Sequence, residues 1–176
     1  MNFERLALIG MMGSGKSTIA ALLSIAAKAP WFDLDVLIER EAGMSVSGIF
    51  SCEGEGKFRQ RETHQLKAIT NETLVPYILS TGGGTPVRSI NRAVLASYRI
   101  VWLDGDVHTL YQRIQSEGRP LVTQSQRQFE SLLEARRPIY RQLAHARFHV
   151  DHRNPDQLAQ LIWAWWQGTG ADDGIE

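Results

Sequence analysis

The sequence has 176 residues, enough for one ordinary domain and too few for two full domains. Hydrophobic residues make up 43% of the chain and charged residues 22%, so we expect a buried core and exclude wholesale disorder. Nineteen basic residues balance nineteen acidic ones, and this excludes a global electrostatic attraction to nucleic acid or to an anionic membrane.

Nothing in the sequence suggests export or membrane insertion. The chain has one cysteine, which cannot form an internal disulfide, and its first residues hold only a short apolar run. No stretch approaches the roughly 18 consecutive apolar residues of a membrane span. We therefore expect a cytoplasmic protein.

Short apolar runs recur along the chain, separated by helix-compatible sequence. They predict strands at residues 6–9, 31–32, 77–79, 100–103 and 148–150. Helices are predicted at about residues 16–28, 54–72, 107–116, 127–144 and 156–166. This alternation is typical of parallel strands that are covered on both faces and joined by right-handed crossovers. We predict a doubly wound α/β fold, a three-layer α/β/α sandwich with a five-stranded parallel sheet, as one domain over residues 1–167.

The first predicted strand leads into a glycine-rich turn. Residues 10–17 read Gly-Met-Met-Gly-Ser-Gly-Lys-Ser, which matches G-x-x-x-x-G-K-[ST] between a strand and a helix. Inward-pointing backbone N–H groups and the following helix N-terminus suit phosphate groups. Lys16 would contact the β- and γ-phosphates, and the Ser17 hydroxyl would bind Mg²⁺. No N-K-x-D guanine signature follows, which disfavours a GTPase.

Two carboxylates follow the second predicted strand. Asp33 and Asp35 are two residues apart, so in extended chain they project to one face, at the carboxyl end where α/β sheets bind ligands. Phosphoryl transfer needs one carboxylate for the metal shell and one that accepts a hydroxyl proton. The alternative is that an aspartate caps the helix that follows.

Several weaker signals come later in the chain. Arg59 and Glu62 lie three residues apart in a predicted helix, and on their own they indicate a solvated surface pair. Residues 80–84 read Ser-Thr-Gly-Gly-Gly after the third strand, which suits either close approach to a ligand or a flexible turn. Arg119 lies in a polar segment of residues 116–126 that we interpret as a lid, and Arg136 marks a second basic site.

The end of the chain carries few signals. The last predicted helix has a core stripe at Leu158, Leu161, Ile162 and Trp165. Trp163 and Trp166 fall off this stripe, and we expect them to pack beside a neighbouring helix rather than to form a partner surface. Residues 168–176 are rich in glycine and acidic, so we predict a flexible tail.

In this order, the motifs resemble the shikimate kinase family. The resemblance runs from residue 6 to about residue 166 and includes the motifs at residues 10–17, 33–35, 49–62, 80–84, 119–121 and 136–140. It implies a P-loop NTPase type of fold with a lid. It further implies ATP-dependent phosphorylation of the 3-hydroxyl of shikimate, giving shikimate 3-phosphate and ADP in the pathway to aromatic amino acids.

The resemblance also implies a role for each matching residue. ATP would be held by Gly13, Ser14, Gly15, Lys16, Ser17, Thr18, Arg113, Arg119 and Arg153, with Arg113 and Arg153 around the adenine. Shikimate would be held by Asp35, Arg59, Gly82, Gly83, Gly84 and Arg136. Mg²⁺ would be bound by Ser17 directly and by Asp33 through water. The catalytic groups would be Asp35 as base, Lys16, and Arg119 from the lid.

Two further readings stay open at this stage. One is another small P-loop kinase, acting on gluconate or a nucleoside monophosphate; the other is a nucleotide-binding or partner-binding module without activity. The chain also departs from the resemblance at Thr85-Pro86-Val87, where a proline follows the glycine loop and is expected to stiffen it. We expect ATP and shikimate as partners, no nucleic acid, no membrane, and a monomer.

Overall fold

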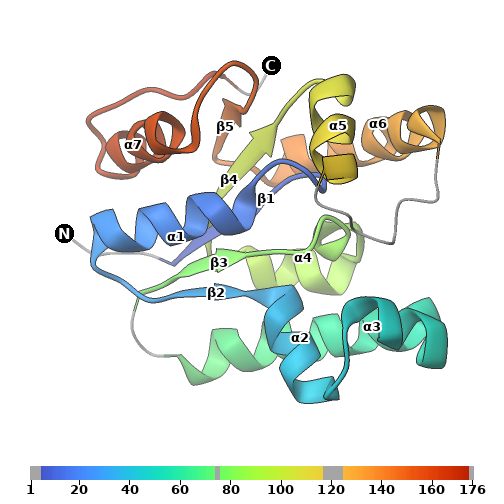
Figure 1. Cartoon of the computed structure of the whole chain (residues 1–176). Coiled ribbons are helices and arrows are strands. Elements are labelled where there is room, and N and C mark those ends of the chain that lie inside the picture. Colours follow the sequence, from blue (N-terminus) through green and yellow to red (C-terminus); the bar gives the residue numbers. More distant parts are fainter. Residues whose placement is uncertain (1–4, 74–75, 117–124, 175–176) are drawn as a thin grey trace.

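The computed structural model describes residues 5–73, 76–116 and 125–174 (Figure 1). Its centre is one five-stranded sheet in which every paired strand is parallel, with the order β2-β3-β1-β4-β5. The strands are β1 (Leu6–Ile9), β2 (Trp31–Asp33), β3 (Ile78–Ser80), β4 (Arg99–Asp104) and β5 (Ala146–His149). The predicted sheet is therefore confirmed. Most of the predicted lid, including Arg119, lies outside the described residues.

Helices cover both faces of the sheet, as Figure 1 shows. They are α1 (Lys16–Ala27), α2 (Leu34–Ala42), α3 (Val46–Glu72), the 3₁₀ helix η1 (Thr85–Val87), α4 (Ser89–Leu95), α5 (Val107–Ser116), α6 (Gln126–Leu143) and α7 (Pro155–Trp166). Strand residues alternate between two hydrophobic clusters because successive side chains point to opposite faces. Leu6 and Leu8 pack with residues of α1 and α7, while Ala7 and Ile9 pack with residues of α2, α3 and α4. The three-layer prediction is thus confirmed.

The predicted helix ranges are wrong at the start of α3 and omit α2, η1 and α4. Helix α3 begins at Val46 rather than near residue 54, because the Ser45 side chain accepts a hydrogen bond from the Gly48 N–H and caps the helix there. Gly54, with a φ of 81° and a ψ of 169°, kinks this helix at the point where the predicted helix begins. The seven-residue helix α4 was not predicted, because it is too short to show a periodic pattern.

The last helix confirms most of its predicted stripe. Leu158, Ile162 and Trp165 are buried, whereas Leu161 is 41% exposed, so the prediction is wrong at that one position. Trp166 is buried in the same cluster, and Trp163 packs edge to face against it with ring centroids 5.7 Å apart. Within the described residues, no helix combines the length and the apolar character that a membrane crossing needs.

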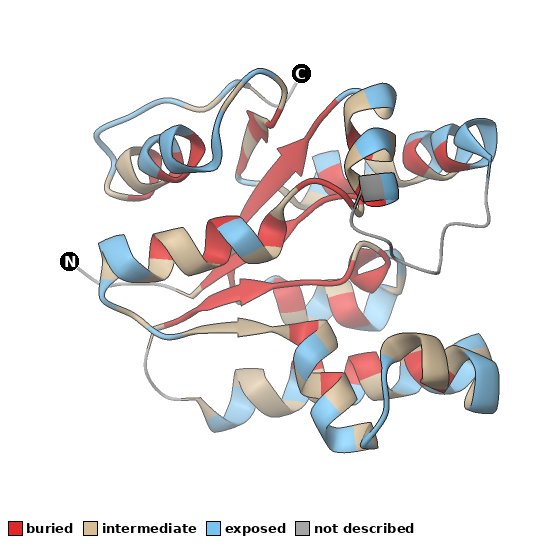
Figure 2. Ribbon diagram, viewed as in Figure 1, coloured by how far each residue is buried: buried red, intermediate tan, exposed pale blue. Residues whose placement is uncertain are grey.

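Burial is concentrated in the sheet, as Figure 2 shows by the red strands at its centre. In a parallel sheet all the carboxyl ends meet at one edge, where ligands bind in open α/β folds. Strands β1, β3 and β2 are successive neighbours, and they end at Ile9, Ser80 and Asp33. The glycine-rich turn at residues 10–17, a second glycine loop at residues 82–84, and the two aspartates Asp33 and Asp35 therefore meet on one side of the molecule.

Candidate active site

The P-loop, residues 10–17, owes its shape to two close backbone contacts. Gly10 has a φ of 145°, and a Cβ there would lie 2.3 Å from the Leu103 carbonyl oxygen. Gly13 has a φ of 81°, and its Cβ would lie 2.4 Å from the Leu110 carbonyl oxygen. Neither position can hold a larger side chain without moving backbone. The glycines thus let the loop lie against β4 and α5.

Lys16 opens α1 and folds back over the loop that precedes it. Its side chain is largely buried, and Nζ donates hydrogen bonds of 2.9 Å to the Gly10 and Met11 carbonyl oxygens. A further contact of 3.4 Å reaches Ser14 Oγ. The ammonium group is therefore held at the P-loop by groups of the loop itself.

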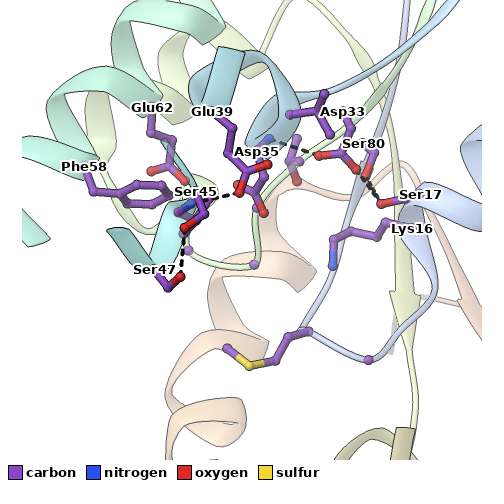
Figure 3. A pocket seen from close by; sticks show the side chains of 18 of the residues that line it. Lys16, Ser17, Asp33, Asp35, Glu39, Ser45, Ser47, Phe58, Glu62 and Ser80 are labelled. Atoms are coloured by element: carbon purple, nitrogen blue, oxygen red, sulfur yellow. Dashed lines mark hydrogen bonds between the residues drawn. The ribbon is translucent and has the colours of Figure 1, made fainter. Parts of the chain in front are cut away.

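Oxygen-bearing side chains from three elements converge beside Lys16 (Figure 3). Ser17 Oγ of α1 donates a hydrogen bond to Asp33 Oδ2 at the end of β2, and it lies 3.2 Å from Ser80 Oγ at the end of β3. Asp33 Oδ1 accepts a 3.0 Å hydrogen bond from the Asp35 N–H. Asp33 is thus the N-cap of α2, so the capping alternative applies to Asp33 and not to Asp35.

Asp35 lies in the first turn of α2 and faces the second glycine loop. A Cβ on Gly82 would come within 3.1 Å of Asp35 Oδ1 and also within 3.1 Å of Glu62 Oε1. Figure 3 shows the Asp35 side chain between the Lys16 group and the Glu62 group. The Asp35 carboxylate therefore lies between the P-loop lysine and the buried glutamate of α3.

The pair of Arg59 and Glu62 is not the solvated surface pair that the sequence indicated, because Glu62 is buried and Arg59 is partly buried. Glu62 is 0% exposed, and both of its oxygens accept hydrogen bonds of 3.2 Å from Arg59 Nη1. Thr85 Oγ1 donates a third hydrogen bond of 2.7 Å to Glu62. The Arg59 guanidinium also lies 5.1 Å from the centroid of the Phe58 ring. These contacts fix Arg59 in one orientation.

The second glycine loop lies in close contact with Arg59 of α3 and with the P-loop. A Cβ on Gly84 would lie 2.6 Å from both Nη atoms of Arg59, and one on Gly83 would lie 3.3 Å from the Gly10 carbonyl oxygen. Close approach to neighbouring protein groups therefore accounts for these glycines, while close approach to a ligand stays a prediction. Pro86 lies in η1, where Thr85 N donates to the Gly82 carbonyl at 3.0 Å.

Helix α6 joins the two loops. The Tyr140 hydroxyl donates a 2.6 Å hydrogen bond to the Gly83 carbonyl oxygen, and burial raises the pKa of Tyr140 to about 12, so it stays a donor at neutral pH. One turn earlier, Arg136 Nη1 lies 3.5 Å from the Met11 Sδ of the P-loop. Pro138 lies between them in the helix. Arg136 is thus held next to the P-loop and the glycine loop together.

Residues of the P-loop, α2, α3, the second glycine loop and α6 line one cavity of about 650 Å³. Of the predicted site residues, the cavity is lined by Gly13, Gly15, Lys16, Ser17, Thr18, Asp33, Asp35, Arg59, Gly82, Gly83, Gly84 and Arg136. Ser14 is buried within the P-loop behind it. The structure thus brings the predicted donor and acceptor residues into one space, with acidic and basic groups facing each other.

Arg113 and Arg153 are placed elsewhere. Neither lines the cavity, and both bond to backbone at the carboxyl end of β5. Arg113 Nη2 donates to the Val150 carbonyl at 3.1 Å, and Arg153 Nη1 donates to the His149 carbonyl at 3.3 Å. Since Leu110 of the same helix as Arg113 contacts the P-loop at Gly13, this arginine pair lies on the α5 side of the P-loop.

Sequence reasoning missed part of the cavity wall. Ser45 in the turn before α3 and Ser47 in the first turn of α3 line the cavity (Figure 3). Helix α2 adds Glu39, whose Oε1 accepts a 2.8 Å hydrogen bond from the Val46 N–H. These residues belong to no motif in the chain. The only sequence signal was the serine at residue 45, which caps a helix that the prediction started too late.

The chain was compared with known proteins. A family model described as shikimate kinase matches residues 12–167. A shikimate kinase from a Sulfurihydrogenibium species is 36% identical over 157 residues, covering 88% of this chain and 93% of that protein. A solved structure of shikimate kinase from Acinetobacter baumannii in complex with shikimate has a TM-score of 0.88 at 32% identity, covering 95% of this chain and 94% of the other. A gluconokinase from Sinorhizobium meliloti, with a TM-score of 0.58 and 14% identity over 94% of this chain and 93% of its own, shares the fold alone.

Proposed function

This chain belongs to the shikimate kinase family, and we propose that the cavity described above is its active site, with ATP on the P-loop side and shikimate on the glycine-loop side. The enzyme transfers the γ-phosphoryl group of ATP to the 3-hydroxyl of shikimate, giving shikimate 3-phosphate and ADP. The observation that carries the site proposal is the single cavity in which a P-loop, a carboxylate and two arginines converge.

On the acceptor side, we assign the shikimate carboxylate to Arg59 and Arg136. A guanidinium donates paired N–H groups in the geometry that a carboxylate accepts, and both arginines line the cavity. Arg59 is already held by its hydrogen bonds to both oxygens of Glu62, so little side-chain entropy is lost when the substrate binds. The glycines at 82–84 line the cavity, and we assign the ring of the substrate to the space beside them.

On the donor side, the P-loop N–H groups and Lys16 bind the β- and γ-phosphates. Lys16 is already in place, and it exchanges hydrogen bonds to two loop carbonyls for the phosphate oxygens, on which negative charge builds up during transfer. Asp35 orients the 3-hydroxyl and accepts its proton as the new bond to phosphorus forms. Arg119, from the segment outside the described residues, is proposed to approach the phosphates and to exclude water.

The donor set beside the P-loop fits Mg²⁺. Ser17 Oγ lies within hydrogen-bond distance of both Asp33 Oδ2 and Ser80 Oγ, and hard oxygen ligands are those that Mg²⁺ prefers. We propose that Ser17 binds the ion directly and that Asp33 holds it through water. The ion supplies positive charge that offsets the charge of the phosphate oxygens.

Arg113 and Arg153 are proposed to enclose the adenine ring. Guanidinium groups stack on aromatic planes, and both arginines are anchored to the same stretch of backbone at the carboxyl end of β5. All the residues assigned here belong to one chain, so a single copy suffices, and we propose a monomeric enzyme that works in the cytoplasm.

A panel of acceptors tests this function. With ATP and Mg²⁺, we expect ADP release that depends on shikimate and stays at background with gluconate or a nucleoside monophosphate. Of these three acceptors, only shikimate carries both a carboxylate and a ring hydroxyl. A coupled ADP assay measures it. Turnover of gluconate or a nucleotide without turnover of shikimate would contradict the proposal. ATP binding with no turnover of any acceptor would favour the inactive module instead.

A further inference from the structure

The last described residues, 168–174, turn back and pack against the domain. Gly168, with a φ of 75°, reverses the chain at the end of α7, and its N–H donates to the Trp165 carbonyl at 2.9 Å. The Thr169 N–H donates to the Ala164 carbonyl at 2.9 Å, and a Cβ on Gly170 would lie 3.0 Å from the Ala164 Cβ. Figure 1 shows this segment returning from α7 toward β5. We call residues 168–174 the C-terminal strap.

The strap covers the open edge of the sheet. Strand β5 is an edge strand, and the Val150 N–H just beyond it bonds to β4. The outward N–H groups of β5 are those of Arg147 and His149. The Arg147 N–H donates to Asp172 Oδ2 at 2.9 Å, and the His149 N–H donates to Asp173 Oδ2 at 2.7 Å. The Asp173 N–H in turn donates to the Arg147 carbonyl at 2.9 Å. Two carboxylates thus accept hydrogen bonds from backbone N–H groups that would have no protein partner on an uncovered sheet edge.

Asp173 makes one contact that Asp172 does not. Its carboxylate forms a two-pronged ion pair with Arg153, from Nη2 to Oδ1 at 2.8 Å and from Nη1 to Oδ2. The Arg153 guanidinium lowers the pKa of Asp173, so the carboxylate stays charged at neutral pH. A two-pronged pair uses N–H groups in the guanidinium plane. Both flat faces of the guanidinium are therefore compatible with stacking while the plane itself is fixed.

The backbone before Arg153 is also set in one conformation. His152 adopts a left-handed φ of 59°, and the Asp106 N–H bonds to the Asp151 carboxylate at 3.0 Å. Arg153 is thus held at its backbone by the turn and at its guanidinium by Asp173. The side chain of Arg153 keeps 30% of its surface exposed, which leaves area for a ligand.

We propose that Asp173 is a positioning residue for nucleotide binding, which fixes the plane of the Arg153 guanidinium so that it stacks on the adenine of ATP. The proposal rests on the assignment of Arg153 to adenine made above. It gives the acidic tail, for which the sequence indicated no role, a place in the donor half of the site.

The test compares two neighbouring aspartates. Asp173→Asn keeps an oxygen that accepts from the His149 N–H but loses the charge that holds Arg153, so we expect the KM for ATP to rise about three- to fivefold, with kcat and the KM for shikimate unchanged. Asp172→Asn is the matched control, because Asp172 accepts a hydrogen bond from the Arg147 N–H of the edge strand β5. The KM for ATP of this variant should equal that of wild type. Asp173→Glu, which keeps the charge, should restore most of the ATP affinity.

Arg153→Ala separates failure of this proposal from failure of the nucleotide assignment. We expect it to raise the KM for ATP about tenfold, and Asp173→Asn to add nothing further in that background. If Arg153→Ala raises the KM for ATP but Asp173→Asn leaves it unchanged, the positioning role is wrong and the nucleotide assignment holds. If neither changes it, the assignment of Arg153 to adenine is wrong as well. Equal increases of the KM for ATP in Asp172→Asn and Asp173→Asn would contradict the positioning role and would mean that the strap only covers the edge of the sheet.

Discussion

Replacing Asp35 by asparagine is expected to lower kcat about 10³-fold, because positioned general bases contribute roughly that factor and an amide cannot accept the hydroxyl proton. The KM for ATP should change little, since the phosphates are assigned to the P-loop and Lys16. The fold should survive, since Asp35 joins the Asp33 cap through its backbone N–H and not through its carboxylate. Steady-state kinetics with both substrates measure the effect.

Glu39→Gln is the matched control for this variant. Glu39 lies one turn after Asp35 on α2 and also lines the cavity, and a glutamine oxygen can still accept the hydrogen bond from the Val46 N–H. We expect kcat of Glu39→Gln to stay within a few-fold of wild type. Near-normal kcat in Asp35→Asn would remove Asp35 from the role of base, and an equal loss in both variants would point to the acidic charge of the cavity instead.

Replacing Arg136 by alanine is expected to raise the KM for shikimate by roughly 10- to 100-fold, the loss of one or two hydrogen bonds to a charged group. The KM for ATP should be largely retained. Arg136 projects from α6 into the cavity beside the P-loop, so its guanidinium is available to the substrate carboxylate. Arg136→Lys should recover only part of the affinity, because an ammonium keeps the charge but lacks the fork.

Arg141, exposed on the same helix, provides the control for the loss of a positive charge. Arg141→Ala should leave the KM for shikimate unchanged. If Arg136→Ala binds shikimate as wild type does, the substrate carboxylate is not held by the arginine pair, and the acceptor half of the site must be reassigned.

The P-loop and the aspartates beside it were the easiest parts of the site to predict from sequence. The P-loop glycines, Lys16 and Ser17 form one local motif, and its shape depends on backbone conformations that only glycine adopts easily. Asp33 and Asp35 were predicted from their two-residue spacing after a strand. Their place beside the P-loop is confirmed, but the extended geometry is wrong for Asp35, because β2 ends at Asp33 and Asp35 lies in the first turn of α2. The structure places these residues together around one cavity.

The buried ion pair and the strap could not be predicted in the same way. Three-residue spacing between Arg59 and Glu62 is common on exposed helices, and only the packing of η1 and the glycine loop against α3 shows that Glu62 is fully buried. The contacts of Asp173 depend on which strand lies at the sheet edge and on a reversal at Gly168. Both are tertiary features, and local sequence carries no signal for them.

The fate of the γ-phosphoryl group tests the central claim most directly, that donor and acceptor react within one cavity. The wild-type enzyme is incubated with ATP, Mg²⁺ and shikimate, and the products are identified by phosphorus NMR. We predict one phosphomonoester, at the 3-oxygen of shikimate, formed in equal amount to ADP, with little inorganic phosphate. Release of inorganic phosphate at the same rate with and without shikimate would contradict the account.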